Sequence, residues 1–133
     1  DKLDDIFTGL RGLATEMKIP IWTASQANRS SLSDDIIGAE KIAEDYSKIM
    51  TADLVISLSR KIEDKLAGTG RWHVIKNRFG PDGITFPSKM NASNGNIEIY
   101  QEDSLQGKET RTDMNNHSEF LRKMMQNKYN DMK

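Results

Sequence analysis

The change of hydrophobic pattern at Pro20 constrains the fold of this chain more than any other feature. Residues 2 to 17 carry apolar side chains at helical spacing, which predicts an amphipathic helix with one face against a core. Pro20 ends that pattern. The run IPIWTASQ, residues 19 to 26, is then apolar on both sides until it reaches Ser25 and Gln26. Such a run favours a strand buried in a parallel sheet, so we expect helices packed on a sheet.

Further helices and strands are expected along the rest of the chain. The polar stretch ANRSSLSDDIIGAEK has the composition of a loop, and a short helix is expected after it, at about residues 39 to 50. Two further strands and a hairpin are predicted, over ADLVISLSR, RWHVIKNRF, and the pair ITFPSKM and GNIEIYQ. Helices between the early strands indicate an α/β fold, with a parallel sheet, helices on its faces and an antiparallel hairpin at its edge. We expect Trp22, Tyr46 and Trp72 in its core.

The overall composition excludes several classes of protein. The chain has 133 residues, which fits one domain or a large part of one, and its net charge of -1 gives no general attraction for nucleic acid or an anionic membrane. It has no cysteine and only two histidines, which excludes disulfides and thiolate metal sites and argues against zinc. No apolar run reaches the roughly 18 residues of a membrane span, and no signal peptide is visible. We therefore expect a protein of the reducing cytoplasm, without a membrane partner and without metal ligands of its own.

Both ends of the chain bear on its organisation. It begins DKLDDIF, without an initiator Met, which suggests a piece of a longer polypeptide. From about residue 102 the hydrophobic pattern fails, and EDSLQGKETRTDMNN has the composition of a polar linker. A last helix is expected at roughly residues 117 to 130. We therefore divide the chain into a folded part, residues 1 to 101, and a polar linker with a C-terminal helix, residues 102 to 133.

The stretch WHVIKNRFGPDG places two cations where a strand runs into a tight turn. Lys76 and Arg78 are two residues apart, so their side chains are expected on the same side of the strand. Proline and glycine in GPDG predict a rigid turn beyond them. Arginine offers phosphate a planar fork and lysine a point charge, so the pair suits a phosphate clamp. The alternative, two solvated residues at a strand end, has about equal weight from the residues alone.

A second group of polar residues follows the apolar run IPIWTASQ. Ser25 and Gln26 would lie at the C-terminal edge of a parallel sheet, where ligands bind in open α/β folds, and a glutamine amide can orient a water or sense a terminal phosphate. In the following loop, amide, guanidinium and hydroxyl side chains suit contacts to a nucleic-acid backbone, namely Asn28, Arg29, Ser30 and Ser31. A polar strand end and an ordinary loop remain the alternatives for these two groups.

These motifs, taken in order, resemble the DnaB family. The family comprises ring-shaped replicative DNA helicases with RecA-like ATPase domains. The resemblance covers about residues 3 to 100 and rests on ASQANR, a polar loop, TADLVISLSR, and IKNRFGPDG followed by a hairpin. It implies that residues 1 to 101 are the C-terminal part of a RecA-like domain. It also implies an ATP-driven motor that translocates on single-stranded DNA during replication and unwinds the duplex.

The resemblance assigns a role to each group of residues. Gln26 matches the glutamine that couples nucleotide state to DNA contact. The segment from Asn28 to about Glu44 matches the central-channel loop that touches single-stranded DNA. Lys76 and Arg78 match the basic pair offered to the ATP of the adjacent subunit, with Arg78 as the arginine finger. The intact parent would be a homo-hexamer of a bacterial or phage-infected cell, with a primase or a loader as further partners.

The chain also departs from the family pattern. It contains no G-x-x-x-x-G-K-[ST] motif, and no apolar strand that ends in the acidic residue that would hold Mg²⁺. In the family both lie upstream of the ASQ strand. We therefore expect the intact parent to use ATP and Mg²⁺. The 133-residue chain alone is expected neither to hold them in the usual pocket nor to hydrolyse ATP.

Two other readings fit the same residues. A RecA-like recombinase or a KaiC-like ATPase would use the same core and the same phosphate contact between subunits for a different output. A non-enzymatic α/β module would instead bind partners through its terminal helix.

Overall fold

The computed structural model describes residues 2 to 26, 36 to 37 and 46 to 132. Four helices and four strands lie within these residues. In chain order they are α1 (Lys2–Met17), α2 (Tyr46–Thr51), β1 (Leu54–Ser59), α3 (Ile62–Ala67), β2 (Thr69–Asn77), β3 (Thr85–Asn91), β4 (Asn96–Ile99) and α4 (Leu105–Asp131). The expected helix at residues 2 to 17 is confirmed. Of the helix expected at about 39 to 50, residues 39 to 45 lie outside the described residues.

The strands form one antiparallel sheet in the order β1-β2-β3-β4. The expected mixture of helices and sheet is therefore confirmed, and so is the hairpin of β3 and β4. The expected parallel sheet was wrong, because every strand pair among the described residues is antiparallel. The connections explain the difference. Residues 60 to 68 join β1 to β2 and residues 78 to 84 join β2 to β3, whereas a parallel pair needs a crossover of about a dozen residues or more.

The apolar run at residues 19 to 26 forms no strand. Trp22, which the sequence placed in the core, is 76% exposed. A strand is stable only when its backbone groups pair with a neighbour, and no described strand pairs with this segment. Hydrophobicity alone therefore does not produce the predicted strand.

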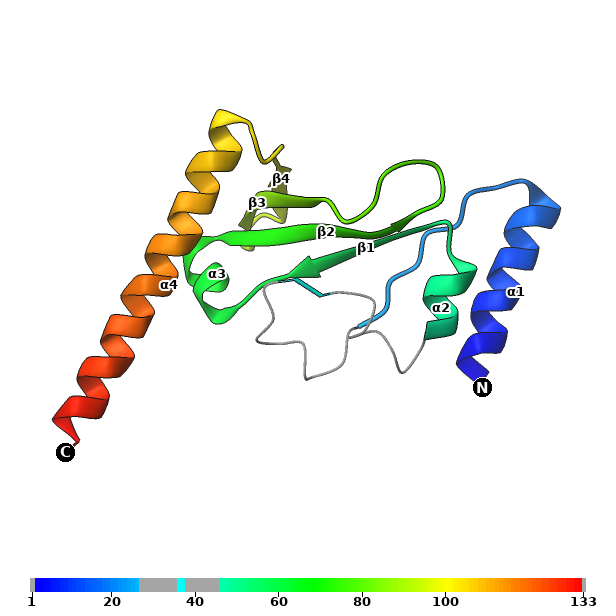
Figure 1. Cartoon of the computed structure of the whole chain (residues 1–133). Coiled ribbons are helices and arrows are strands. Elements are labelled where there is room, and N and C mark those ends of the chain that lie inside the picture. The colour runs from blue at the N-terminus through cyan, green and yellow to red at the C-terminus, as the bar shows by residue number, and fades with distance from the viewer. Residues whose placement is uncertain (1, 27–35, 38–45, 133) are drawn as a thin grey trace.

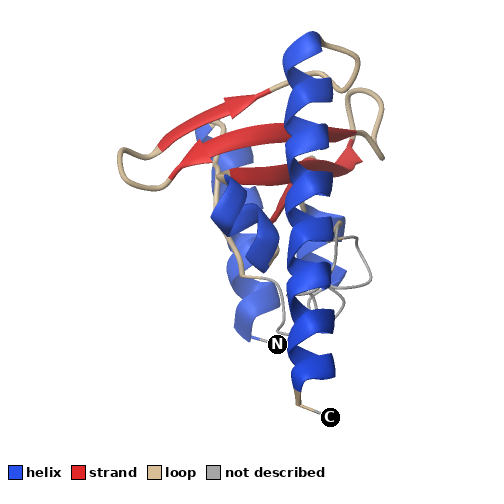
Figure 2. Ribbon diagram, turned by 90° about the vertical axis from the view of Figure 1, so that its left-hand side faces the viewer, coloured by secondary structure: helices blue, strands red, loops and turns tan. Residues whose placement is uncertain are grey.

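The helices lie in two pairs, one at each end of the sheet (Figure 1). α4 packs against α3 and β3, and α3 packs against β2. α1 packs against α2 at the other end (Figure 1). Figure 2 shows the first half of α4 crossing the sheet and its second half extending past it. Within the described part of the chain the buried apolar side chains are Ile49, Pro87 and Met114, so the closed core is small.

A buried carboxylate joins α3 to β2. Asp64 is 1% exposed, and its oxygens accept hydrogen bonds from the backbone of Lys61 at 2.8 Å and from the Thr69 hydroxyl at 3.0 Å. Arg71 forms an ion pair with the same carboxylate at 2.5 Å. Gly68 ends α3 in the left-handed conformation, with φ of 68°, which turns the chain directly into β2. The connection between β1 and β2 is therefore a capped helix with a satisfied buried charge.

α4 begins at Leu105, so the expected linker at residues 102 to 116 was wrong. The Ser104 hydroxyl caps the helix by accepting a hydrogen bond from the Gly107 backbone at 3.0 Å. Gly107 lies so close to the Gln101 carbonyl oxygen that an added Cβ would stand 2.1 Å from that atom. A small residue at this position lets α4 start tightly against the preceding turn.

Candidate functional site

The end of β2 is fixed by a well-bonded turn. The Val74 backbone donates to the Ile84 carbonyl at 2.9 Å, and the Gly83 backbone donates to the Val74 carbonyl at 2.8 Å. The Asn77 side chain accepts from the Phe79 backbone at 3.1 Å and donates to the Pro81 carbonyl at 3.2 Å. Gly83 takes φ of 72°, as the turn chemistry predicted. The chain around Lys76 and Arg78 is therefore held by hydrogen bonds on both sides of the turn.

Lys76 binds the end of a helix. Its ammonium donates to the Ile49 carbonyl at 3.0 Å and to the Met50 carbonyl at 3.1 Å, both in the last turn of α2. Carbonyls of a last helical turn have no partner within the helix, and the helix dipole is negative there. Lys76 therefore stabilises the C-terminal end of α2.

Arg78 binds the residue that follows the same helix. Its Nη1 atom lies 2.6 Å from Oδ1 of Asp53, and its backbone N–H donates to the Asp53 carbonyl at 2.9 Å. The Arg78 side chain is 47% exposed and the Asp53 side chain 40% exposed. The ion pair therefore holds the guanidinium in position while solvent still reaches it.

A third cation reaches the same place from α1. Arg11 Nη1 donates to Oδ1 of Asp53 at 3.0 Å and to the Thr51 carbonyl at 2.9 Å. One carboxylate oxygen is therefore shared by two guanidinium groups, from Arg11 and Arg78. The shared carboxylate holds α1 and the end of β2 together across the α2–β1 connection.

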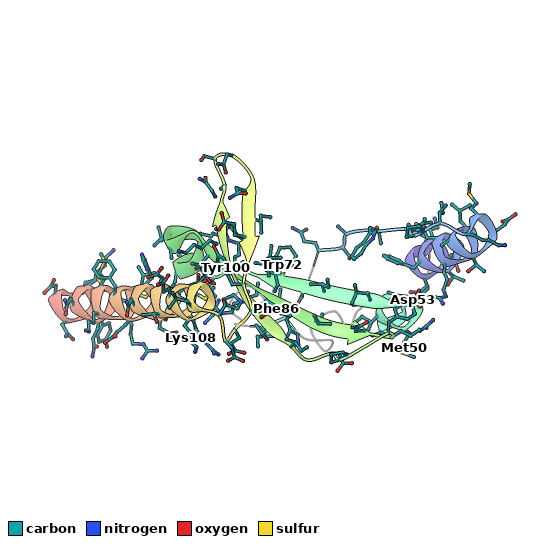
Figure 3. The ribbon with its side chains drawn as sticks, turned by 90° about the horizontal axis from the view of Figure 1, so that it is seen from above. Met50, Asp53, Trp72, Phe86, Tyr100 and Lys108 are labelled. Atoms are coloured by element: carbon teal, nitrogen blue, oxygen red, sulfur yellow. The ribbon has the colours of Figure 1, made fainter. Side chains whose placement is uncertain are left out.

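We call Arg11, Asp53, Lys76 and Arg78 the basic cluster. Three cations and one carboxylate give it a net charge of +2, whereas the whole chain carries -1. It lies where α1, α2 and the end of the sheet meet; Met50 and Asp53 mark this end in Figure 3. Half-exposed guanidinium groups are chemically suited to contact an anion such as phosphate.

The structure brings some of the predicted site residues together. Lys76 and Arg78 both reach the segment from Ile49 to Asp53. Gln26 is exposed at the end of the first described segment, and no hydrogen bond joins it to either cation. Four predicted DNA-binding residues lie outside the described residues, namely Asn28, Arg29, Ser30 and Ser31.

Sequence reasoning missed Arg11 and Asp53. Arg11 lies about 100° from Leu10 around the axis of α1, at the edge of the expected apolar face, where a charged residue is ordinary and signals no partner. Asp53 comes directly before the apolar run of β1, where it reads as an ordinary strand boundary. They are 42 residues apart, so their contact could not be inferred from local patterns.

Other parts of the described chain offer less to a ligand. A cavity of about 630 Å³ lies between the sheet and α4, and its walls include Arg71, Thr85, Arg111 and Met114. Arg71 is already paired with Asp64, and Arg111 is paired with Glu102. No group of three or more metal-ligating side chains occurs in the described residues.

No described helix is both long and apolar enough to cross a membrane. Comparison of the chain with protein-family models, with curated proteins and with solved structures found no significant match. Its function must therefore be argued from the residues of the basic cluster and from the motifs around them.

Proposed function

We propose that this chain is the C-terminal part of the ATPase domain of a ring-shaped, DnaB-like replicative DNA helicase. In this proposal the basic cluster completes the ATP site of the adjacent subunit. One observation carries the proposal. Lys76 and Arg78 lie at the end of β2, which a hydrogen-bonded turn holds in place, and both side chains contact the segment from Ile49 to Asp53. A cation that must meet a phosphate on another subunit needs such a rigid support, because misplacement costs transition-state stabilisation.

Each cation has a chemical task in the proposed site. Arg78 presents its guanidinium to the γ-phosphate, where it stabilises the charge that develops on the phosphate oxygens. Such an arginine contributes about 10³ to 10⁵ in rate. Lys76 adds a point charge beside it. Arg78 must exchange the Asp53 carboxylate for phosphate, and Arg11 remains as a partner that keeps Asp53 neutralised.

The nucleotide and its metal belong to the rest of the proposed motor. The sequence contains no phosphate-cradling G-x-x-x-x-G-K-[ST] motif, so ATP and Mg²⁺ would be held by residues outside it. ATP supplies the free energy for movement. Gln26 and the loop from Asn28 to about Glu44 would couple that energy to single-stranded DNA in the central channel of a homo-hexamer. A primase or loader would bind elsewhere on the ring.

The proposal is tested by binding of tripolyphosphate, which carries the charge of the ATP phosphates without the base. The 133-residue chain should bind it in low salt by isothermal titration calorimetry, and Arg78→Ala should lose at least about tenfold in affinity, as expected when a charge-assisted contact of about 1.5 kcal/mol or more is removed. Arg122→Ala, which removes the same charge from exposed α4, is the control. Equal loss in both variants, or no binding by the wild-type chain, would rule out the proposed phosphate site.

One observation favours a second candidate function, a protein-interaction module. The second half of α4 exposes large apolar side chains, among them Phe120 and Met125. Under this alternative the basic cluster serves only to hold α1 and α2 on the sheet. Arg78→Ala would then lower the melting temperature without changing the affinity for tripolyphosphate.

A further inference from the structure

The turn between β3 and β4 carries an asparagine that is followed directly by a glycine. Asn94–Gly95 is the one Asn-Gly pair in the sequence. It lies in the turn that joins the two strands, and every residue from 91 to 99 is exposed. Figure 3 shows this hairpin projecting from the body of the molecule. Water and hydroxide therefore reach both residues.

The side chain of Asn94 folds forward along the backbone. Its Oδ1 atom accepts a hydrogen bond from the Asn96 backbone N–H at 3.0 Å. This bond closes a ring that includes the peptide nitrogen of Gly95, which is the pattern of an Asx turn. The ring keeps the side-chain carbonyl carbon, Cγ, beside that nitrogen. The hydrogen bond also draws electrons toward the carbonyl oxygen, so Cγ is more open to attack by a nucleophile.

Gly95 leaves its peptide nitrogen unshielded. Glycine has no Cβ, and apart from its chain neighbours nothing lies within 4 Å of the position that a Cβ would take. Its φ of 71° is a backbone conformation that favours glycine. The shape of the hairpin therefore selects the residue type that least obstructs a reaction at its own nitrogen.

Two other asparagines make the same kind of turn without a glycine after them. The Asn91 Oδ1 atom accepts from the Ser93 backbone N–H at 3.0 Å, and the next residue is Ala92. Asn77 makes the corresponding bond at 3.1 Å, and the next residue is Arg78. In both turns a side chain on the following residue obstructs the approach of Cγ to the peptide nitrogen. Asn91, in the same hairpin, is therefore an internal comparison in which only the glycine differs.

We propose that Asn94 is a site of spontaneous deamidation. The Gly95 peptide nitrogen gives its proton to hydroxide and attacks Cγ of Asn94, so that an N–Cγ bond forms. The Cγ–Nδ2 bond breaks, and Nδ2 takes a proton from water and leaves as ammonia, which regenerates the hydroxide. The product is a five-membered imide between the two residues. The reaction needs only water and hydroxide, and it does not depend on the proposed helicase function.

Water opens this imide in one of two ways. Cleavage of the N–Cγ bond gives aspartate on the original backbone. Cleavage of the bond from the nitrogen to the main-chain carbonyl carbon gives isoaspartate, whose backbone runs through Cγ and is longer by one methylene group. Either product adds one negative charge, so the formal net charge goes from -1 to -2. The longer backbone lies between Asn91 and Asn96, which pair across the turn, and β4 has four exposed residues, so we expect isoaspartate to weaken the pairing of β4 with β3.

Mass spectrometry of the 133-residue chain tests the proposal. The folded chain is incubated in mildly alkaline buffer and digested with trypsin, and the peptide that contains Asn91 and Asn94 is fragmented to locate the change. Asn94 should convert at least about tenfold faster than Asn91, because only Asn94 precedes a glycine. The rate should rise with pH, because hydroxide removes the proton from the Gly95 nitrogen. No conversion at Asn94 in the folded chain, or equal rates at the two asparagines, would overturn the proposal.

Ala92→Gly tests the role of the glycine by adding a second one. It creates an Asn-Gly pair at Asn91 in the same exposed turn, so the rate at Asn91 should rise at least about tenfold. The rate at Asn94 should stay as in the wild type, which also shows that the hairpin is kept. An unchanged rate at Asn91 would mean that the following glycine does not control the reaction, and the assignment of Asn94 would fail.

Discussion

Arg78 lies 2.6 Å from the Asp53 carboxylate, on the same oxygen that accepts a hydrogen bond from Arg11. The side chain most suited to a phosphate is thus already paired with an internal anion. Because both partners are half exposed, the pair is worth little free energy and can open at small cost. Asp53 therefore competes with any phosphate that approaches Arg78.

The first prediction concerns this competition. Asp53→Asn removes the competing charge and raises the net charge of the basic cluster from +2 to +3. One unit charge about 4 Å away in a water-like environment is worth about 1 kcal/mol, so tripolyphosphate affinity should rise about fivefold. Calorimetric titration in low salt measures it. Asp131→Asn makes the same charge change at the far end of α4 and should have little effect. A weaker affinity in Asp53→Asn would mean that Asp53 orients Arg78 for binding instead of competing with phosphate.

The second prediction concerns the polar loop. If the segment that begins at Asn28 follows single-stranded DNA, Arg29→Ala should weaken binding to an oligothymidylate and lower the slope of log affinity against log salt by about one. Fluorescence anisotropy of a labelled oligonucleotide at several salt concentrations gives both values. Arg122→Ala serves as the matched control. If affinity and slope are the same in Arg29→Ala and the wild type, the loop does not contact DNA.

Local signals in the sequence predicted local structure well. The turn at GPDG was predicted from residue chemistry, and Gly83 in it adopts the positive φ that glycine allows. α1 follows from the spacing of its apolar residues. The antiparallel arrangement of the strands could not be predicted in this way. It depends on which strands pair, and contacts between residues far apart in the sequence decide the pairing. The strand expected at residues 19 to 26 failed for the same reason.

The first half of α4 shows a different limit of sequence reading. Its buried face consists of Gly107, Thr110 and Met114, at helical spacing but with little hydrophobicity. A search for apolar residues therefore finds a linker there, although the Ser104 cap was a readable signal. In the candidate site, turn chemistry identified the setting of Lys76 and Arg78. Arg11 and Asp53 joined them only through tertiary contacts.

The third prediction concerns the buried carboxylate of α3. Asp64→Ala removes the partner of Arg71, whose side chain is only 19% exposed, and leaves the Thr69 hydroxyl and the Lys61 backbone without their acceptor. Loss of one partner from a buried ion pair costs about 3 to 5 kcal/mol of unfolding free energy. Urea unfolding followed by circular dichroism measures the loss. Lys123→Ala, which breaks the exposed pair with Glu119, should cost less than about 0.5 kcal/mol. Similar losses in the two variants would show that Asp64 does not organise the α3–β2 junction.

The fourth prediction concerns pH and the end of β4. The Tyr100 hydroxyl and then the Asn96 amide donate to the Glu98 carboxylate, and these bonds lower the pKa of Glu98 below its ordinary value of 4.5. The same bond from Tyr100 to Glu98 raises the pKa of Tyr100 above 10.0. A lowered carboxyl pKa means that the stabilisation is present above pH 4.5 and is lost as the pH falls through the lowered value. A raised tyrosine pKa means that the stabilisation is present below pH 10.0 and is lost as the pH rises through the raised value.

Tyr100→Phe separates the two contributions to the Glu98 pKa. It removes the larger cause of the shift and keeps the bond from Asn96, so the pKa of Glu98 should rise toward 4.5 without reaching it. Carboxyl carbon shifts in an NMR titration measure that pKa directly. Tyr129→Phe removes a phenol from α4 instead and should leave the Glu98 pKa unchanged. If the Glu98 pKa is the same in Tyr100→Phe and the wild type, the bond between Tyr100 and Glu98 does not persist in solution.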